Sequence, residues 1–433
     1  MARADWPEII QQLLGIVGGP ANVDAAVQKA RNPTTGLPTL LDKHLIVDGA
    51  SFLLWVVGYL NWTPSETSDS TNVYDMICIF YYIFDQLPLS TYQTAISATS
   101  ENQPLMPLSA WMVTFAQQMG QYMNTTDSLT AETFASFQAA ALYNTAESES
   151  PDGTGYHTFN QFFGRHLATP RPISGGGDNK VVVYPADSRF DAAFAIDAGD
   201  KTDTGKPIAP LSSSSPPPPT VQVKGLPWDI TALLNGSQYA AEFAGGTWAH
   251  SFLCTYNYHR MHCPVSGTVV EARVVPGAAY LQVQADPATG TIKKRRLIGP
   301  PPTDDGLKID AVDGSGYQFL QARGLFVIDT STSLEGDIGL VAILPIGMAQ
   351  VDSVVPLVRA KGDTSQPTFP FLVQKGDPLA YFQFGGSDII VAFQAKAGMT
   401  GTSFKTEPDQ TTAPNDPARQ WSRYGQQLAQ AAL

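Results

Sequence analysis

The sequence predicts an α+β protein in which a helical N-terminal region, residues 1–150, precedes a β-rich region, residues 151–433. Two observations lead to this expectation. Apolar residues recur at helical spacing in the first region, and after Pro151 they form short runs rich in Val, Ile, Phe and Tyr that Gly and Pro divide. A chain of 433 residues with 43% hydrophobic residues is long enough to bury one large core or two smaller ones.

Helical periodicity marks the first region. From Trp6 to about Ala146 the apolar residues return every three or four positions, as Trp111, Phe115 and Met119 do. Turn residues, for example in segment 125–128, separate or cap the helices. We expect these apolar stripes to form a core and assign them no chemistry.

Strands are predicted in the second region, for example at Lys180–Tyr184, Thr268–Val275 and Ile389–Phe393. Two stretches interrupt this pattern. Residues 201–220 contain a run of four serines and four prolines, which is typical of a flexible loop. Residues 286–306, with the basic cluster Lys293–Arg296 and three prolines, are predicted to form a second loop. Because it follows a histidine pair, we hypothesise that it covers the active-site pocket.

The net charge and the cysteine content indicate which partners and which cellular compartment to expect. The formal net charge of −13 would repel nucleic acid and anionic lipid, so neither is expected as a partner. Three irregularly spaced cysteines suit free thiols in a reducing compartment. The N-terminus lacks the pattern of a secretion signal, and Asn61 and Asp85 end the longest apolar stretches. We therefore expect a cytoplasmic protein without stable membrane insertion.

Three segments carry residues suited to catalysis. His259 and His262 lie in the segment YHRMHCP, Ser387 follows Gly386 in FGGSD, and Asp187 follows a predicted strand in YPAD. An Asp, a His and a Ser together can activate a hydroxyl group, because the His takes the proton and the Asp stabilises its charge. Zinc would need three or four ligands, and no further residues with ligand spacing accompany the two histidines, so we expect no metal.

These segments resemble the phosphatidylserine decarboxylase family across about residues 151–395. The resemblance rests on six blocks in family order: FNQFFGR with RPI at 159–173, YPAD at 184–187, KG with LL at 224–234, YHRMHCP with Gly at 258–267, VPG at 275–277, and KGD with FGGS at 375–387. It implies a mainly antiparallel, β-rich pyruvoyl-decarboxylase core as the catalytic domain. Together with the helical region, the chain resembles the fungal soluble branch that includes tryptophan decarboxylases.

The resemblance implies that the chain is a zymogen that cleaves itself. Ser387, deprotonated by His262 with Asp187 orienting it, would attack the carbonyl carbon of Gly386 and convert the peptide bond to an ester. Elimination would break the chain between residues 386 and 387 and leave dehydroalanine, which hydrolyses to a pyruvoyl group. Two glycines suit this step because they tolerate unusual backbone conformations. The small and large chains would remain associated.

The pyruvoyl group derived from Ser387 would be the cofactor, and neither metal nor pyridoxal phosphate would be required. Its carbonyl can form a Schiff base with a substrate amine and accept the electrons released by decarboxylation. The resemblance assigns His259 as the acid that then protonates the substrate carbanion. The implied activity is that of a carboxy-lyase.

Two positions depart from the family pattern. Relatives commonly have Thr after the cleavage-site serine, whereas this chain has Asp388. A carboxylate beside the new carbonyl would disfavour an anionic substrate group or slow cleavage. The family's Asp is often followed by Gly, and here Ser188 follows Asp187.

The expected substrate is a free amino acid, L-tryptophan or another aromatic one. The alternative is phosphatidylserine, which would give phosphatidylethanolamine, but a lipid substrate would favour a membrane anchor or a basic interfacial patch. A serine hydrolase is a different class of function, and the usual Gly-x-Ser-x-Gly elbow is absent at Ser387. An inactive binding protein is the remaining alternative, which the complete Asp, His, His and Ser set disfavours.

Overall fold

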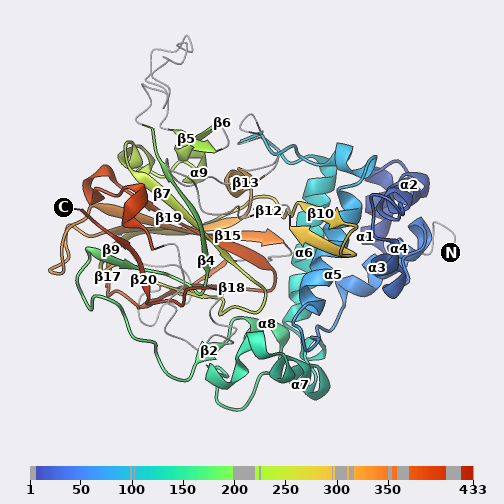
Figure 1. Ribbon diagram of the computed structural model, residues 1–433, viewed down its shortest axis with the longest axis horizontal. Coiled ribbons are helices and arrows are strands. Elements are labelled where there is room, and N and C mark those ends of the chain that lie inside the picture. The colour runs from blue at the N-terminus through green and yellow to red at the C-terminus, as the bar shows by residue number, and fades with distance from the viewer. Residues whose placement is uncertain are drawn as a thin grey trace, which may run out of the picture.

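The computed structural model describes residues 6–97, 100–101, 103–197, 220–223, 226–294, 296–297, 310–311, 316–349, 354–357, 370–405 and 421–432. Helices of the N-terminal region gather on one side of the molecule, and the strands of the β-rich region fill the other side (Figure 1). The α+β fold class predicted from the sequence is therefore confirmed. The division into domains 1–150 and 151–433 stays a prediction, since one buried cluster includes residues of both regions.

Helices form where the periodicity predicts them. They are α1 (Glu8–Ile16), α2 (Pro20–Ala30), α3 (Pro38–Lys43), α4 (Gly49–Leu60), α5 (Asn72–Phe84), α6 (Pro107–Met123) and α7 (Ala131–Ala139). The short α8 (Phe159–Phe163) lies beyond them, in the region predicted to be β-rich. Proline occupies the first position of α2, α3 and α6, where its missing N–H costs no hydrogen bond. At α4, Asp48 caps the helix by accepting a hydrogen bond from the backbone N–H of Ser51 at 2.8 Å.

The largest sheet in the described part of the chain has seven strands, and each pair of neighbours is antiparallel. Its order is β17 (Phe371–Val373), β9 (Gly267–Val275), β14 (Arg323–Asp329), β15 (Leu340–Ala349), β19 (Gly386–Phe393), β7 (Thr247–Leu253) and β4 (Arg189–Ala195). The predicted strands at 268–275 and 389–393 are confirmed as parts of β9 and β19.

Smaller antiparallel pairings surround this sheet. A three-stranded sheet has the order β16 (Val354–Pro356), β18 (Pro378–Phe382) and β8 (Arg260–His262). Two-stranded sheets pair β1 (Ser148–Glu149) with β2 (His166–Leu167), β3 (Val181–Val183) with β20 (Gln427–Gln430), β5 (Thr220–Val223) with β6 (Leu226–Asp229), β10 (Val283–Asp286) with β11 (Thr291–Lys294), and β12 (Arg296–Leu297) with β13 (Asp310–Ala311). The prediction of a strand at 180–184 is confirmed by β3.

The prediction of a loop over residues 286–306 is wrong in part. Its first half belongs to the β10–β11 hairpin and to β12. The physical reason is burial: Val283 and Ile292 are 7% and 3% exposed, and the hairpin packs against α5. Residues 298–306 lie outside the described residues, as do residues 201–219 of the other predicted loop and the side chains of the basic cluster Lys293–Arg296.

The two faces of β19 enter different buried clusters. Ile389 and Val391 join the cluster that extends into the helical region, whereas Ile390 and Ala392 join a second cluster around Trp248. Successive side chains of a strand point to opposite faces, so the alternation is that of a strand buried on both sides. By the same alternation, residues 387 and 388 face opposite sides of the sheet.

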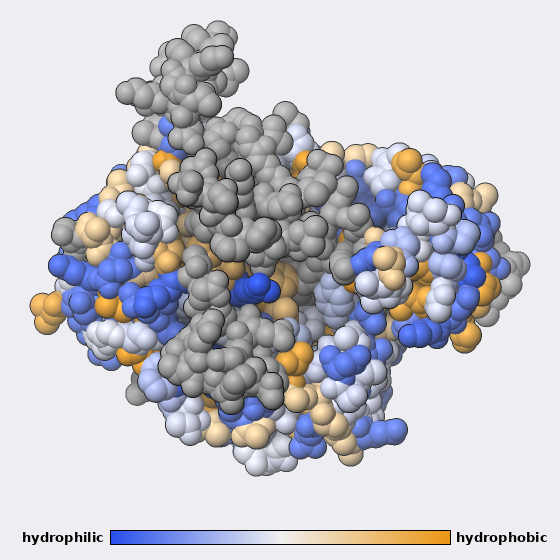
Figure 2. Space-filling model, viewed as in Figure 1, coloured by the Kyte–Doolittle hydropathy of each residue, from blue (hydrophilic) through white to orange (hydrophobic). Residues whose placement is uncertain are grey.

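The described surface offers no long apolar helix. Among the described residues, no helix has the length and hydropathy needed to cross a bilayer. On the face shown in Figure 2, hydrophilic residues are interspersed with hydrophobic ones over both the helical and the β-rich sides.

Candidate active site

The predicted cleavage bond lies at the beginning of β19. The sequence places Ser387 before an Ile-rich strand, but in the structure the strand already begins at Gly386, because residue 387 pairs with Gly347 of β15 and Leu253 of β7. The β15 register shifts opposite this bond, between Gly347 and Ala349. Gly385 has a φ of 144°, a conformation that favours glycine. The chain therefore turns sharply into the strand just before the candidate scissile bond.

The hydroxyl of Ser387 is a buried polar group without a partner. Ser387 is 0% exposed, and its Oγ makes no hydrogen bond within the described structure. A buried hydroxyl left in this state costs about 1–3 kcal/mol and calls for an explanation.

His262 is a neutral base in this structure. Its Nδ1 lies 2.8 Å from the carbonyl oxygen of Gly376, and its Nε2 lies 3.0 Å from the hydroxyl of Tyr258. The carbonyl can only accept, so Nδ1 carries the proton and Nε2 accepts from Tyr258. Its ring stacks on Tyr424 at 3.8 Å between centroids. Burial lowers the pKa of His262 to about 4, against a smaller opposing effect of the Gly376 bond.

Asp187 lies close to this histidine but has other partners. Its carboxylate forms an ion pair with Arg171 and accepts the backbone N–H of Tyr424 at 2.9 Å. Pro185, two residues earlier, accepts the backbone N–H of His262 at 2.7 Å. Tyr424 thus contacts both residues, one through its backbone and the other through its ring. Among the described residues, no hydrogen bond joins Asp187 to His262 or His262 to Ser387, so the predicted triad stays a prediction.

His259 is fully buried on the approach to the cleavage segment. Its ring stacks on Phe163 of α8 at 3.9 Å, and Phe163 also packs against Phe384, three residues before Ser387. The backbone of His259 accepts the N–H of Phe382 at 2.9 Å. Trp62 from the helical region contacts Phe384 as well, at 6.3 Å between ring centroids. Contacts among Phe163, Phe384 and Trp62 therefore connect His259 and the helical region to the turn before the candidate scissile bond.

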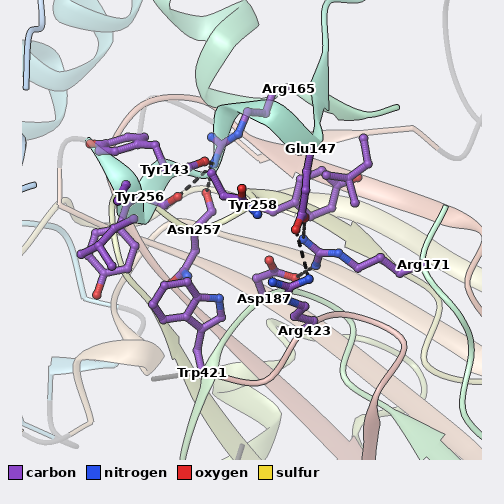
Figure 3. A pocket seen from close by; sticks show the side chains of 14 residues that line it. Tyr143, Glu147, Arg165, Arg171, Asp187, Tyr256, Asn257, Tyr258, Trp421 and Arg423 are labelled. Atoms are coloured by element: carbon purple, nitrogen blue, oxygen red, sulfur yellow. Dashed lines mark hydrogen bonds and ion pairs between the residues drawn. The ribbon is translucent and has the colours of Figure 1, made fainter. Parts of the chain in front are cut away.

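A polar cavity of about 350 Å³ opens beside Asp187 (Figure 3). Aromatic and charged side chains from both regions of the chain surround it. The labelled ones are Tyr143, Glu147, Arg165, Arg171, Asp187, Tyr256, Asn257, Tyr258, Trp421 and Arg423. Its volume falls in the range of small-molecule sites.

Arginines set the electrostatics of this cavity. Arg165 Nη2 donates to the carbonyl oxygens of Tyr143, Tyr256 and Asn257 at 2.9–3.2 Å, which fixes the histidine-bearing segment against the helical region. Burial alone would raise the pKa of Glu147, but its bonds with Arg171 and its attraction to Arg423 outweigh this effect and lower it. The carboxylate therefore stays charged inside the cavity.

Sequence reasoning missed several of these residues. Arg165, Arg171 and Tyr258 stand in the family blocks, but nothing there assigns them a contact with Asp187 or His262. Tyr424 and Trp421 belong to the last part of the chain, and only folding brings them beside His262 and the cavity. No sequence signal near either residue points to this position.

The carboxylate of Asp388 does not face the same side as Ser387. It is 0% exposed, accepts a hydrogen bond from the hydroxyl of Tyr317, and lies 3.1 Å from His250 Nε2 on the other face of the sheet. The expectation that this carboxylate lies beside the new carbonyl is therefore wrong, because the strand alternation directs it to the other face. Its effect on an anionic substrate or on cleavage stays a prediction. In the described part of the chain, no three His, Cys, Asp or Glu side chains gather in a way that could hold a metal ion.

Comparison with known proteins identifies the family. The family model for phosphatidylserine decarboxylase matches residues 159–413, which is more than half of the chain. A phosphatidylserine decarboxylase proenzyme from Anaeromyxobacter sp. (strain K) is 28% identical over 271 residues, 60% of this chain and 77% of the relative. An L-tryptophan decarboxylase from Psilocybe cubensis is 24% identical over 259 residues, 59% of this chain. This chain spans only 50% of that relative's length.

A third relative extends the similarity into the helical region. The decarboxylase iboD from Amanita muscaria is 24% identical over 336 residues, which cover 72% of this chain and 85% of the relative. This alignment is longer than the match to the family model. From these matches, the chain belongs to the phosphatidylserine decarboxylase family of pyruvoyl-dependent enzymes and is itself a decarboxylase, a carboxy-lyase.

Proposed function

We propose that the chain is a proenzyme that cleaves itself between Gly386 and Ser387 and then decarboxylates a free amino acid, L-tryptophan or another aromatic one. The observation that carries the first part is the buried, unpartnered hydroxyl of Ser387, directly after a glycine turn. It fits a residue that is to become the cofactor, because the group forms from the chain itself.

Self-cleavage in this proposal begins at the hydroxyl of Ser387. Its Oγ adds to the carbonyl carbon of Gly386, the bond to the nitrogen of residue 387 breaks, and an ester replaces the peptide. His262 Nε2 takes the hydroxyl proton and returns it to the released amine. In the structure the hydroxyl of Tyr258 is hydrogen-bonded to Nε2, so this hydrogen bond has to break before Nε2 can accept the proton of Ser387. Asp187 acts through Tyr424, because it accepts the backbone N–H of Tyr424, and the ring of Tyr424 stacks on the imidazole.

Chain cleavage then follows by elimination. Loss of the Cα proton of residue 387 expels the carboxylate of Gly386 and leaves dehydroalanine, which takes up water and releases ammonia to give the pyruvoyl group. We propose that the two chains stay together, since β19 of the small chain lies between β15 and β7 of the large one.

In decarboxylation, the carbonyl of the pyruvoyl group would bind the substrate amine and accept the electrons released as carbon dioxide leaves. His259 is the proposed proton donor to the substrate carbon after carbon dioxide leaves. Its ring is held by stacking on Phe163 and by edge contact with Phe382, so its direction is fixed before substrate arrives.

Two observations support an aromatic amino acid as the substrate. The cavity beside Asp187 has aromatic rings, Tyr256 and Trp421 at 5.2 Å between centroids, and arginines that would attract a carboxylate. Two Psilocybe relatives are named L-tryptophan decarboxylases.

Phosphatidylserine is the second candidate substrate, with phosphatidylethanolamine as the product. It is favoured by the phosphatidylserine decarboxylase proenzymes among the relatives, of which the Anaeromyxobacter protein is 28% identical. A lipid substrate requires the protein to meet a bilayer surface, so vesicles of phosphatidylserine belong in every substrate assay.

Intact mass spectrometry of the purified protein tests the first part of the proposal. We expect two chains, residues 1–386 and 387–433, with a ketone on the small chain that hydroxylamine traps. Release of carbon dioxide from L-tryptophan, from other L-amino acids and from phosphatidylserine vesicles then ranks the substrates. A chain that stays intact and reacts with a fluorophosphonate at Ser387 would indicate a hydrolase. An intact and inert chain would indicate a binding protein.

A further inference from the structure

A buried network of charged groups begins one residue after Ser387. Asp388 Oδ2 accepts a hydrogen bond from the hydroxyl of Tyr317 at 2.8 Å and lies 3.1 Å from His250 Nε2. His250 Nδ1 lies 2.7 Å from Asp191 Oδ2. Asp388 and His250 are 0% and 1% exposed. The network therefore joins β19 to β7, to β4 and to the short helix at Tyr317–Phe319.

Strand register brings these side chains together. Asp388 pairs with Phe252 of β7. His250 lies two residues before Phe252 in β7, on the same face of the sheet. Asp191 reaches this face because β4 bulges there: Phe190 pairs with Ser251 and Ala192 with His250, which leaves Asp191 as the extra residue. The bulge thus delivers a carboxylate to the far ring nitrogen of the histidine.

The charges in this network match one another. An ionised carboxylate only accepts hydrogen bonds, so an imidazole that bonds to two ionised carboxylates has to donate from both of its nitrogens. Such charge-assisted bonds are shorter and stronger than neutral ones. Trp248 stacks on the ring at 5.7 Å between centroids and excludes water from one side. Removing one member would leave a buried charge without its partner, which is strongly unfavourable.

We propose that this network anchors the new N-terminus of the small chain and holds the pyruvoyl group in position. The inference rests on the proposed function. Before cleavage, residue 387 is held by peptide bonds on both sides. After cleavage it ends a chain and no longer has a backbone N–H. Asp388 is then the first residue with a complete amide, and its side chain is clamped from two elements.

Asp388, His250, Asp191 and Tyr317 are thus positioning residues, not catalytic ones. They lie on the face of β19 opposite to Ser387, so substrate does not reach them. The proposal predicts that the network matters for the cleaved protein and much less for cleavage itself. A purely structural contribution would instead affect the intact and the cleaved protein alike.

The test uses Asp388→Asn in two backgrounds, the normal chain and the uncleavable variant Ser387→Ala. Hydrogen exchange is followed at the amides of residues 388–390. We expect Asp388→Asn to speed exchange at least about tenfold in the cleaved protein and to change it little in the Ser387→Ala background. Turnover per ketone, counted by hydroxylamine, should fall about tenfold to a hundredfold in kcat with little change in KM, since a displacement of about 1 Å has such effects.

Ile390→Val is the matched control, on the same face of the same strand but outside the network. It should change neither kcat per ketone nor the exchange difference between the two backgrounds. Tyr317→Phe removes a single hydroxyl and decides the question if Asp388→Asn does not fold. It should lower kcat by about threefold to tenfold, the worth of one buried hydrogen bond.

Four outcomes are distinguishable. A normal chain that never cleaves overturns the proposed function and this inference together. A normal chain that cleaves, with Asp388→Asn or its substitute Tyr317→Phe at normal kcat and normal exchange, overturns the anchor alone. Folded Asp388→Asn that does not cleave also overturns it, since the network would then act before the chain breaks. Faster exchange confined to the cleaved protein, with lower kcat, supports the anchor.

Discussion

His262 and His250 are both buried, yet their surroundings give them opposite properties. His262, 6% exposed, lies between the Gly376 carbonyl, the Tyr258 hydroxyl and the ring of Tyr424, with its pKa lowered to about 4. His250, 1% exposed, lies between two carboxylates. Two buried histidines therefore have different kinds of partner, neutral groups around His262 and carboxylates around His250. The first environment suits a proton acceptor, and the second suits a fixed ionic clamp.

The largest expected effect is the difference in self-cleavage rate between His262→Gln and His250→Gln. His262→Gln removes the proposed base, so cleavage should slow by about a hundredfold to ten-thousandfold. His250→Gln should slow cleavage by no more than a few fold, and its defect should appear in turnover. Mass spectrometry of both variants over time measures the ratio of the two chains to the precursor. Equal loss of cleavage in both variants would remove the functional distinction.

The next largest effect is expected at His259, whose replacement should affect decarboxylation but not self-cleavage. His259→Ala should leave cleavage largely intact and lower decarboxylation by about a hundredfold or more, because only the second reaction needs its proton. The measurement is carbon dioxide release per trapped ketone. Phe163→Leu is the companion variant, which keeps the imidazole but removes its stacking partner. It should cause a smaller loss, and a larger loss than in His259→Ala would mean that packing, and not the proton, matters.

The pH dependence of cleavage reports directly on His262. Because its pKa is lowered to about 4, the base is neutral at pH 7 and stays so down to about pH 5. The cleavage rate should be level over this range and reach half its value near pH 4, as measured on freshly refolded precursor. A midpoint near the ordinary value of 6.5 would contradict the environment described for this ring.

Folding stability should follow the same group. Between the ordinary value of 6.5 and about 4, the unfolded chain takes up a proton that the folded chain does not. The contribution of His262 is therefore fully present above this window and is lost as the pH falls through it, by roughly 3 kcal/mol in total. Denaturant titrations of Ser387→Ala with and without His262→Gln isolate this contribution.

Tyr258→Phe should give the smallest effect. It removes the hydroxyl that occupies His262 Nε2, a bond worth about 1 kcal/mol, so cleavage should accelerate about fivefold. Slower cleavage would instead show that the hydroxyl relays the proton. Tyr256→Phe, which alters a neighbouring cavity residue without touching His262, is the matched control.

Local patterns predicted much of the fold, and long-range geometry explains what they missed. Helical spacing around Trp111 and strand-like runs around Ile389 identified the correct elements, because these signals are local. Asp191 gave no signal, since only a bulge brings it to the face of His250. The strand at Thr291–Lys294 was predicted to be part of a loop, because the burial of Ile292 depends on packing against α5, which is distant in sequence.

For the candidate site, too, the sequence indicated segments but not the partners of their side chains. Family blocks predicted Asp187, His262 and Ser387 as site residues, and this assignment stays a prediction. They did not give the partners of Asp187, because Arg171 and Tyr424 come from distant parts of the chain. Asp388 stood out as a departure from the family pattern, but which way its carboxylate faces depends on strand alternation, and that required the start of β19 to be known.

The position of β19 between β15 and β7 has a consequence for the life of the protein. If the chain breaks at its first bond, the strand has already been threaded into the middle of a finished sheet while still covalently attached. Two separated chains would have to insert that strand between neighbours that pair with it on both edges. Maturation would then be a one-way event: the enzyme folds once, as a single chain, and a denatured mature form has no direct route back.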